Sequence, residues 1–284
     1  MYICNSITHK PHKMEDSNTH FERHGWFKPL MPSIIYIASQ LVAGLVLTIF
    51  IIATANALNK RTLMAWMLLC SDILAVLILQ LTKSINFRKA FSPSSKVTHT
   101  TFYALAGAAT GIFATDILTE FLSLPNSMEE DFMRIQDSSI GILSIAVIGP
   151  IAEELAFRQA TLGGMLHRGM RPARAIIISA LLFGIIHLNW AQTVPAFVIG
   201  VMLGIIYFKT RNIILTSIIH IANNSIAVAM VATLDEDASD FSLVGALGGN
   251  IAAIALIAVC YAISAFLLLR LWRSPSKLDH AHLA

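Results

Sequence analysis

The feature of this chain that most constrains its fold is a series of long apolar blocks separated by short polar connections. Each block is about as long as an α-helix that crosses the roughly 30 Å hydrocarbon core of a bilayer. A membrane β-barrel would instead show short segments in which apolar and polar residues alternate. The pattern therefore predicts an all-α, polytopic membrane bundle with about eight transmembrane helices. These spans are predicted at residues 34–58, 63–81, 102–122, 140–166, 173–190, 193–208, 213–234 and 243–272.

The composition excludes the common classes of soluble protein. Charged residues make up 13% of the 284 residues and hydrophobic residues 56%, whereas about 25% of the residues in a typical soluble domain are charged. Most of the basic residues behind the net charge of +3 lie in the terminal segments or the connections between predicted spans, and they do not cluster on one soluble surface. Nucleic acid is therefore not an expected partner, and a lipid bilayer is the expected environment. Cys4, Cys70 and Cys260 lack the spacing of a disulfide framework or a cysteine metal site.

The distribution of basic residues predicts the orientation of the bundle. Of the 20 Lys and Arg residues, all but Lys60, Arg61, Arg134 and Arg158 lie in the two terminal segments or in alternate connections. By the positive-inside rule, both termini are therefore predicted to be cytoplasmic. The chain divides into a polar cytoplasmic segment at residues 1–30, a transmembrane bundle at 31–273 and a short cytoplasmic tail at 274–284. We expect a multi-pass protein of a cell membrane, with a bacterial plasma membrane as the favoured location.

The fifth and sixth predicted spans are short and are separated by only two residues, Ala191 and Gln192. This spacing predicts a tight helical hairpin, with a re-entrant element as the alternative. Gly200 and Gly204 form a small-xxx-small pattern in the sixth span, which indicates close packing between helices.

The fourth predicted span contains charged residues at membrane depth, where each charge costs several kcal/mol unless it is paired or hydrated. Glu153 and Glu154 are adjacent, and Arg158 follows Glu154 by four residues. Glu154 and Arg158 can therefore face each other, which leaves Glu153 about 100° around the helix and available to another neighbour. Pro150 is expected to bend this helix just before the two carboxylates.

Three further polar side chains are predicted at a similar depth on two other helices. His187 lies in the fifth span, and His220 and Asn224 share one face of the seventh. At 1.5 Å per residue, these groups and Glu153 lie roughly 14–22 Å from the nearest basic connection. Helical phase favours Asn224 over the adjacent Asn223 as the amide that faces the others.

Two interpretations of these groups follow from the residues alone. A single intramembrane histidine is more often a packing residue that is hydrogen-bonded to a neighbouring helix. Four groups that converge at one depth, however, are sufficient for hydrolysis, because they supply a general base, a water-orienting partner and oxyanion donors. Asp72, Asp116 and Glu120 also lie at membrane depth, where they either line a hydrated cavity or bond between helices, and they are left outside the predicted site.

Four motifs in this order resemble those of the CPBP family of intramembrane endopeptidases, which includes type II CAAX prenyl endopeptidases and bacterial Abi and bacteriocin-processing proteins. The resemblance covers residues 150–224, and the family-like core is placed at about 138–234. The EExxxR motif is Glu153, Glu154 and Arg158, FxxxH is Phe183 and His187, the FxxGxxxG-like segment is Phe197, Gly200 and Gly204, and HxxxN is His220 and Asn224.

This resemblance implies hydrolysis of a peptide bond in a membrane-embedded or lipidated protein or peptide. It implies that Glu153 and His187 hold and activate the water, while His220 and Asn224 stabilise the oxyanion. A non-proteolytic immunity or scaffold protein, or a small transporter, is the alternative. The sequence does not identify the substrate or its cleavage position.

Within the same resemblance, Arg158 fixes Glu154 and the local helix geometry. Whether a metal takes part stays open, because Glu153, His187 and His220 also form a set of zinc ligands known from metalloproteases. A glutamate-type mechanism without a cofactor is favoured, with zinc as the alternative, since a buried glutamate suits water activation and an amide is a better oxyanion donor than zinc ligand.

Overall fold

The computed structural model describes residues 27–53, 60–91, 99–233 and 242–274. Nearly all of the predicted N-terminal segment and of the C-terminal tail lies outside these residues. The described part is helical and contains no strand. Its longer helices are α2 (Met31–Ala53), α3 (Lys60–Leu81), α5 (His99–Leu122), α10 (Pro172–Ile185), α11 (Trp190–Thr210), α12 (Ile213–Thr233) and α14 (Asn250–Arg273).

The fourth predicted span is a continuous helical stretch in which the hydrogen-bonding pattern changes along its length. It consists of α7 (Ser139–Leu143), the π-helix η2 (Ser144–Ile148), α8 (Gly149–Glu153), the π-helix η3 (Glu154–Leu162) and α9 (Gly163–His167). Short helices occupy the connections: η1 (Lys28–Leu30), α4 (Phe87–Ala90), α6 (Glu129–Gln136) and α13 (Leu243–Ala246).

Among the described residues, seven helical stretches are long and apolar enough to cross a membrane, which confirms a polytopic membrane protein. The fifth predicted span is shorter than the expected 173–190. Its helix α10 has 14 residues, or about 21 Å at 1.5 Å per residue. Pro172 begins this helix, and the chain turns after Ile185 with Leu188 in the left-handed conformation (φ 49°).

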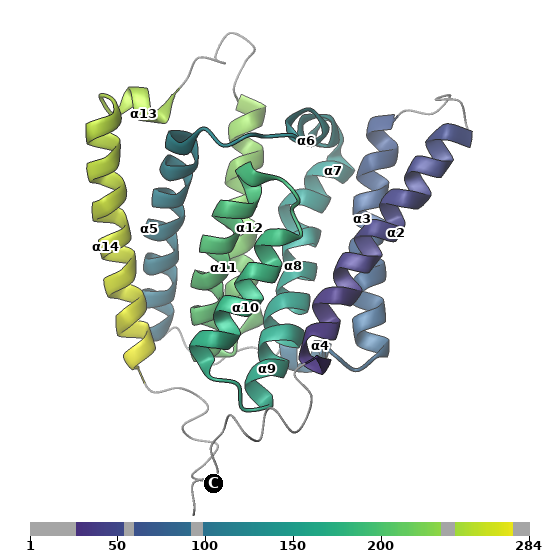
Figure 1. Cartoon of the computed structure of the whole chain (residues 1–284), viewed down its shortest axis with the longest axis horizontal. Helices are drawn as coiled ribbons and strands as arrows, with labels where there is room; N and C mark the ends of the chain where they lie inside the picture. The colour runs from purple at the N-terminus through teal and green to yellow at the C-terminus, as the bar shows by residue number, and fades with distance from the viewer. Residues whose placement is uncertain (1–26, 54–59, 92–98, 234–241, 275–284) are drawn as a thin grey trace, which may run out of the picture.

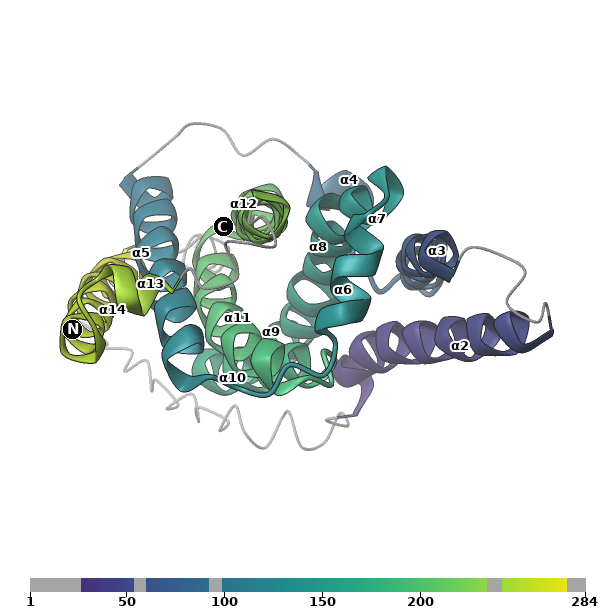
Figure 2. The ribbon, with the colours of Figure 1, turned by 90° about the horizontal axis from the view of Figure 1, so that it is seen from above.

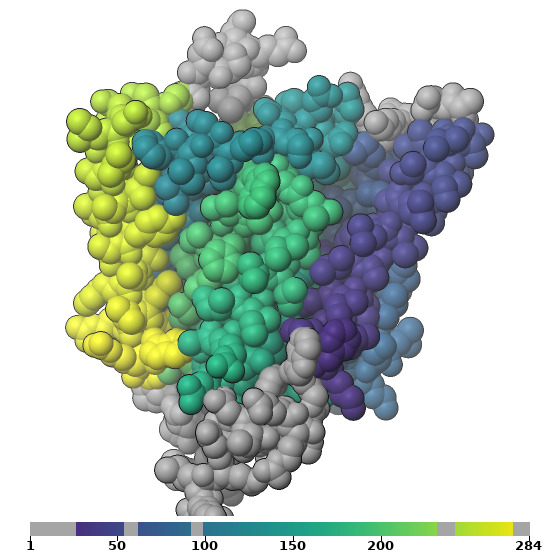
Figure 3. All heavy atoms as spheres, in the orientation of Figure 1, coloured from purple at the N-terminus to yellow at the C-terminus, as the bar shows by residue number. Residues whose placement is uncertain are grey.

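The helices form a central group with a pair on each flank (Figures 1 and 2). The fourth span, α10, α11 and α12 make up the centre, where α10 packs against α11 and α12 packs against η2 and α8. The α5/α14 pair lies on one flank and the α2/α3 pair on the other. Side chains of α10 and α11 fill the middle of the face shown in Figure 3.

The two ends of the bundle differ in charge. The connections that contain α4 and α9 lie at one end, and α6 and α13 lie at the other (Figure 1). The first end carries basic residues such as Arg88, Lys89 and Arg168, whereas α6 begins with Glu129, Glu130 and Asp131. The positive-inside rule predicts that the basic end faces the cytoplasm.

The predicted hairpin of the fifth and sixth spans is present as α10 and α11, and glycines allow the two helices to approach closely. A Cβ atom on Gly200 would lie 3.1 Å from the Phe183 ring and 3.2 Å from the Ala180 Cα atom. One on Gly204 would lie 3.0 Å from Ile176. The small-xxx-small pattern therefore has the packing role that the sequence indicated.

The π-helical turns around Pro150 leave backbone carbonyls available to side chains. The Gly149 amide bonds to the carbonyl of Ser144 instead of that of Ile145, and proline has no amide hydrogen to donate. Asn224 of α12 donates to the Ile145 carbonyl (3.0 Å). The π-helical turn thus leaves a backbone carbonyl free to accept a hydrogen bond from a neighbouring helix.

Candidate functional site

The predicted site residues meet where α8 and η3 pack against α10 and α12. His220 of α12 lies beside both consecutive glutamates of the fourth span. Its Nδ1 atom is 3.1 Å from Glu154 Oε1, and its Nε2 atom is 3.5 Å from Glu153 Oε2. The tertiary structure therefore places one imidazole against two carboxyl groups that point in different directions from the same helix.

Glu154 and Arg158 form the pair that their four-residue spacing predicts. Arg158 Nη1 is 3.2 Å from Glu154 Oε1, and both side chains are buried. The guanidinium group also lies over the Phe183 ring, 4.2 Å from its centre. Because Glu154 faces a guanidinium, it acts as a hydrogen-bond acceptor, and we infer that His220 donates to it from Nδ1.

Phe183 is the packing centre of the site. Its ring makes edge contacts with the imidazoles of both His187 (5.3 Å between centres) and His220 (5.6 Å). On another side it contacts Phe157 of η3 (5.5 Å). The phenylalanine of the FxxxH motif therefore sets the separation of the two histidines.

His187 is held by the last turn of α10. Its Nδ1 atom lies 3.0 Å from the Phe183 carbonyl. Since a carbonyl only accepts hydrogen bonds, Nδ1 carries the proton, and neutral His187 presents the lone pair of Nε2. A nitrogen in this state can accept a hydrogen bond from water.

The two asparagines of α12 form a short chain. Asn224 donates to the Ile145 carbonyl, and Asn223 donates to Asn224 Oδ1 (3.0 Å). The amide favoured by helical phase is therefore the one that contacts the fourth span. In this structure its NH₂ group bonds to that backbone carbonyl.

Burial divides the site into two layers. Glu154, Arg158 and His220 have relative exposures of 0%, 1% and 4%. Glu153, His187 and Asn224 are partly exposed. Glu154 and Arg158 of the buried layer are suited to structural support, whereas His220 reaches from that layer to the partly exposed Glu153 through Nε2.

The described side chains do not form a ready metal site. No group of three or more His, Cys, Asp or Glu residues in the described ranges is arranged to hold an ion. His220 places its nitrogens against the two glutamates, and His187 Nδ1 faces a backbone carbonyl. In this geometry the zinc set of Glu153, His187 and His220 does not form such a group, although metal-binding histidines also make hydrogen bonds at one ring nitrogen.

Sequence reasoning left two neighbours of Glu153 outside the site. Asp72 of α3 and Tyr36 of α2 are both buried, and both interact electrostatically with Glu153. Asp72 accepts a hydrogen bond from the Tyr36 hydroxyl (2.8 Å), so it bonds between helices, one of the two roles considered for it. The sequence does show Asp72 as a carboxylate inside an apolar block. Helical periodicity, however, does not identify the residue on another helix that it contacts.

Glu120 has a different role from the residues of the site. It accepts hydrogen bonds from the Ser242 hydroxyl and from the amides of Leu243 and Val244, at 2.7–3.1 Å. It therefore holds the first turn of α13 against the end of α5. This contact is a helix cap at the acidic end of the bundle.

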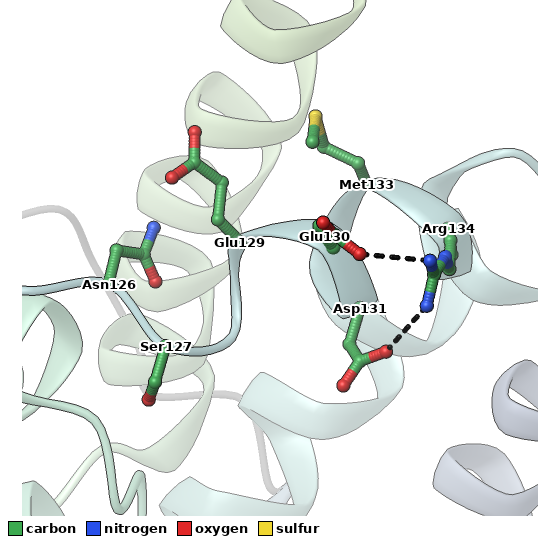
Figure 4. A pocket seen from close by; sticks show the side chains of 7 residues that line it. All are labelled: Asn126, Ser127, Glu129, Glu130, Asp131, Met133 and Arg134. Carbon is green, nitrogen blue, oxygen red and sulfur yellow. Dashed lines mark hydrogen bonds and ion pairs between the residues drawn. The ribbon is translucent and has the colours of Figure 1, made fainter.

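A cavity of about 530 Å³ lies at the acidic end of the bundle (Figure 4). Glu130 and Asp131 pair there with Arg134. None of the predicted site residues lines this cavity. The full lining is Asn126, Ser127, Glu129, Glu130, Asp131, Met133 and Arg134.

Residues 136–226 match the model of the family described as type II CAAX prenyl endopeptidase Rce1-like. The matched segment contains all four motifs and every predicted site residue. The match confirms the resemblance that the motifs indicated. No curated protein and no solved structure matches the chain.

Proposed function

We propose, from the match of residues 136–226 to the Rce1-like family of type II CAAX prenyl endopeptidases, that this membrane protein hydrolyses a peptide bond with a glutamate-activated water. The observation that carries the proposal is the position of Glu153. It is partly exposed, while its neighbour Glu154 is buried with Arg158. One carboxylate is thus available for chemistry and the other supports the structure.

In this mechanism Glu153 is the general base. It takes a proton from a water molecule that also donates a hydrogen bond to His187 Nε2, and the water oxygen attacks the carbonyl carbon of the substrate. The tetrahedral intermediate then collapses as its C–N bond breaks. Glu153 returns the proton to the leaving nitrogen, and the new carboxylic acid gives the second proton of the water to the amine, so that the products are a carboxylate and an ammonium group.

His220 and Asn224 would stabilise the oxyanion of the intermediate. In this mechanism His220 is the imidazolium, which has a proton on each nitrogen: it donates from Nδ1 to buried Glu154 and from Nε2 to the developing negative charge. Asn224 becomes the second donor after its amide leaves the Ile145 carbonyl on substrate binding. Arg158 keeps Glu154 ionised and thereby maintains the orientation of the imidazole.

The substrate class follows from the location of the site. Peptide bonds that reach Glu153 belong to a protein or peptide that is embedded in the bilayer or attached to it by a lipid. We propose no cofactor for this reaction, and zinc remains the alternative for the experiment to test. The favoured location is a bacterial plasma membrane.

The test is a quantitative comparison of peptide termini in membranes from cells that contain the wild-type protein or the Glu153→Gln variant at equal expression. Termini that form only with the wild type, and again when purified protein meets the purified candidate substrate, are the expected result. Glu129→Gln is the matched control, because Glu129 is exposed on α6, outside the site.

The competing role is that of a binding or transport protein that does not cut peptides. It predicts that the Glu153→Gln and wild-type membranes contain the same termini while deletion of the protein still changes the cell. That result would exclude the peptidase assignment.

A further inference from the structure

The α2/α3 pair carries a buried polar network on the side that faces the fourth span. Asp72 Oδ1 accepts hydrogen bonds from the Tyr36 hydroxyl (2.8 Å) and from Gln40 Nε2 (2.7 Å). The Ser71 hydroxyl in turn donates to Gln40 Oε1 (2.6 Å). Tyr36, Ser71 and Asp72 are each no more than 2% exposed.

Backbone geometry places this network on the face of α8 that carries Glu153. A Cβ atom on Gly149 would lie 3.5 Å from Asp72 Oδ2. Gly149 and Glu153 are four residues apart in the same helix, so they share a face. Glu153 also interacts electrostatically with both Tyr36 and Asp72.

The Tyr36 ring is held in place independently of its hydroxyl. It makes an edge contact with Phe157 of η3, with 5.5 Å between ring centres. Phe157 in turn contacts Phe183, the packing centre of the site. The tyrosine is therefore oriented by an aromatic contact at its ring and by Asp72 at its hydroxyl.

We propose that Tyr36, oriented by Asp72, is a positioning residue for Glu153. This inference rests on the proposed function. The hydroxyl has a single hydrogen, and it is donated to Asp72, so the Tyr36 oxygen keeps lone pairs that can accept a hydrogen bond. Glu153 can donate to that oxygen while it holds the proton taken from water, and it releases this bond when the proton passes to the leaving nitrogen. Tyr36 keeps its own proton throughout, and Asp72 stays the acceptor of that proton's hydrogen bond.

This arrangement would give the outer helices α2 and α3 a part in catalysis. Without the tyrosine oxygen, the protonated carboxyl group loses its partner and can rotate away from the leaving nitrogen. Misplacement of a catalytic group by about 1 Å can reduce the rate by about 100-fold. The effect falls on the chemical step and leaves substrate binding unchanged.

The experiment compares Tyr36→Phe and Asp72→Asn with Tyr261→Phe, in protein reconstituted into lipid vesicles. Tyr261 is the matched control, because its hydroxyl also bonds between helices, to Thr115 (3.0 Å), but on the α5/α14 flank. The substrate is a peptide that spans the cleavage site defined by termini absent with Glu153→Gln. We expect Tyr36→Phe and Asp72→Asn to lower kcat by about 10- to 100-fold with KM within about twofold, while Tyr261→Phe changes neither.

A spectroscopic measurement tests the same contact without a substrate, at a pH low enough for Glu153 to carry the proton that it donates to Tyr36. The infrared carboxyl band of Glu153 is identified by its loss in Glu153→Gln. It should shift in Tyr36→Phe and keep its position in Tyr261→Phe. A merely structural tyrosine would leave both kcat and this band at the level of the control.

The outcomes separate this inference from the proposed function. If Glu153→Gln abolishes cleavage while Tyr36→Phe and Asp72→Asn match Tyr261→Phe, the positioning role is wrong and the peptidase assignment stands. If Glu153→Gln leaves cleavage unchanged, the proposed function fails and the positioning role fails with it.

Discussion

His220 Nδ1 lies 3.1 Å from Glu154 Oε1, which joins α12 to the fourth span between residues that are 66 positions apart in the sequence. The same glutamate pairs with Arg158. Buried Glu154 therefore contacts two groups. One is Arg158, which balances its charge, and the other is His220, whose second ring nitrogen faces Glu153. Glu154 and Arg158 of the EExxxR motif thus orient His220 of the HxxxN motif.

Removal of the Arg158 charge should destabilise the bundle. Arg158→Met leaves Glu154 buried without its cation, and such a change typically costs about 3–5 kcal/mol. The double variant Glu154→Gln/Arg158→Met should recover part of this loss, because no unpaired charge remains. Denaturant unfolding in detergent measures both effects. If the double variant unfolds as easily as Arg158→Met alone, the pair is not electrostatically coupled as we describe.

The two asparagines of α12 should differ in their contribution to stability. Asn224→Ala removes the donor to the part-buried Ile145 carbonyl, and loss of this hydrogen bond is expected to cost about 1 kcal/mol. Asn223→Ala should cost less, because Asn223 donates to a side chain instead. Thermal unfolding of the two variants gives the comparison. Equal losses would contradict this assignment of the amides.

Close packing between α10 and α11 should make Gly200 intolerant of larger residues. Gly200→Val is expected to destabilise the protein by about 1–3 kcal/mol through overpacking against Phe183 and Ala180. Gly44 of α2 is the matched control, because a Cβ atom there meets nothing within 4 Å. The melting temperature in detergent should fall for Gly200→Val and change little for Gly44→Val.

Glu120 should control the order of α13. Glu120→Ala removes the acceptor for the Ser242 hydroxyl and for the Leu243 and Val244 amides. A loss of about 1.4 kcal/mol of capping corresponds to about tenfold faster local opening. Hydrogen exchange at residues 243–246 should therefore accelerate by about this factor. Glu129→Ala provides the control, and equal exchange in both variants would show that the cap is not needed.

Proteolysis should continue after metal removal. The mechanism that we propose uses the Glu153 carboxylate as the base and needs no ion. Dialysis against a chelator should therefore leave the cleavage rate of a verified substrate within about twofold of the untreated protein. A rate that falls on chelation and returns with zinc would replace the glutamate mechanism with the metal alternative.

Local sequence patterns predicted the features that depend on residues close together in the chain. The apolar blocks predicted a polytopic bundle, with α10 shorter than expected because its helix ends at Ile185. The four-residue spacing predicted the contact between Glu154 and Arg158. The spacing of Gly200 and Gly204 predicted close helix packing.

The network around Glu153 required the tertiary structure. Tyr36 and Asp72 come from two outer helices, and no periodicity in either helix points to the fourth span. The π-helical turns were also not predictable from the presence of Pro150 alone, although they release the Ile145 carbonyl that Asn224 binds.

The sequence by itself determined that this chain crosses a membrane and which helices carry its ionisable groups, because burial in lipid and helical phase depend on residues within a few turns. The tertiary structure decided which groups touch. His220 lies between Glu153 and Glu154, and Tyr36 and Asp72 lie near Glu153, because the packing angles and the register of separate helices bring these atoms together.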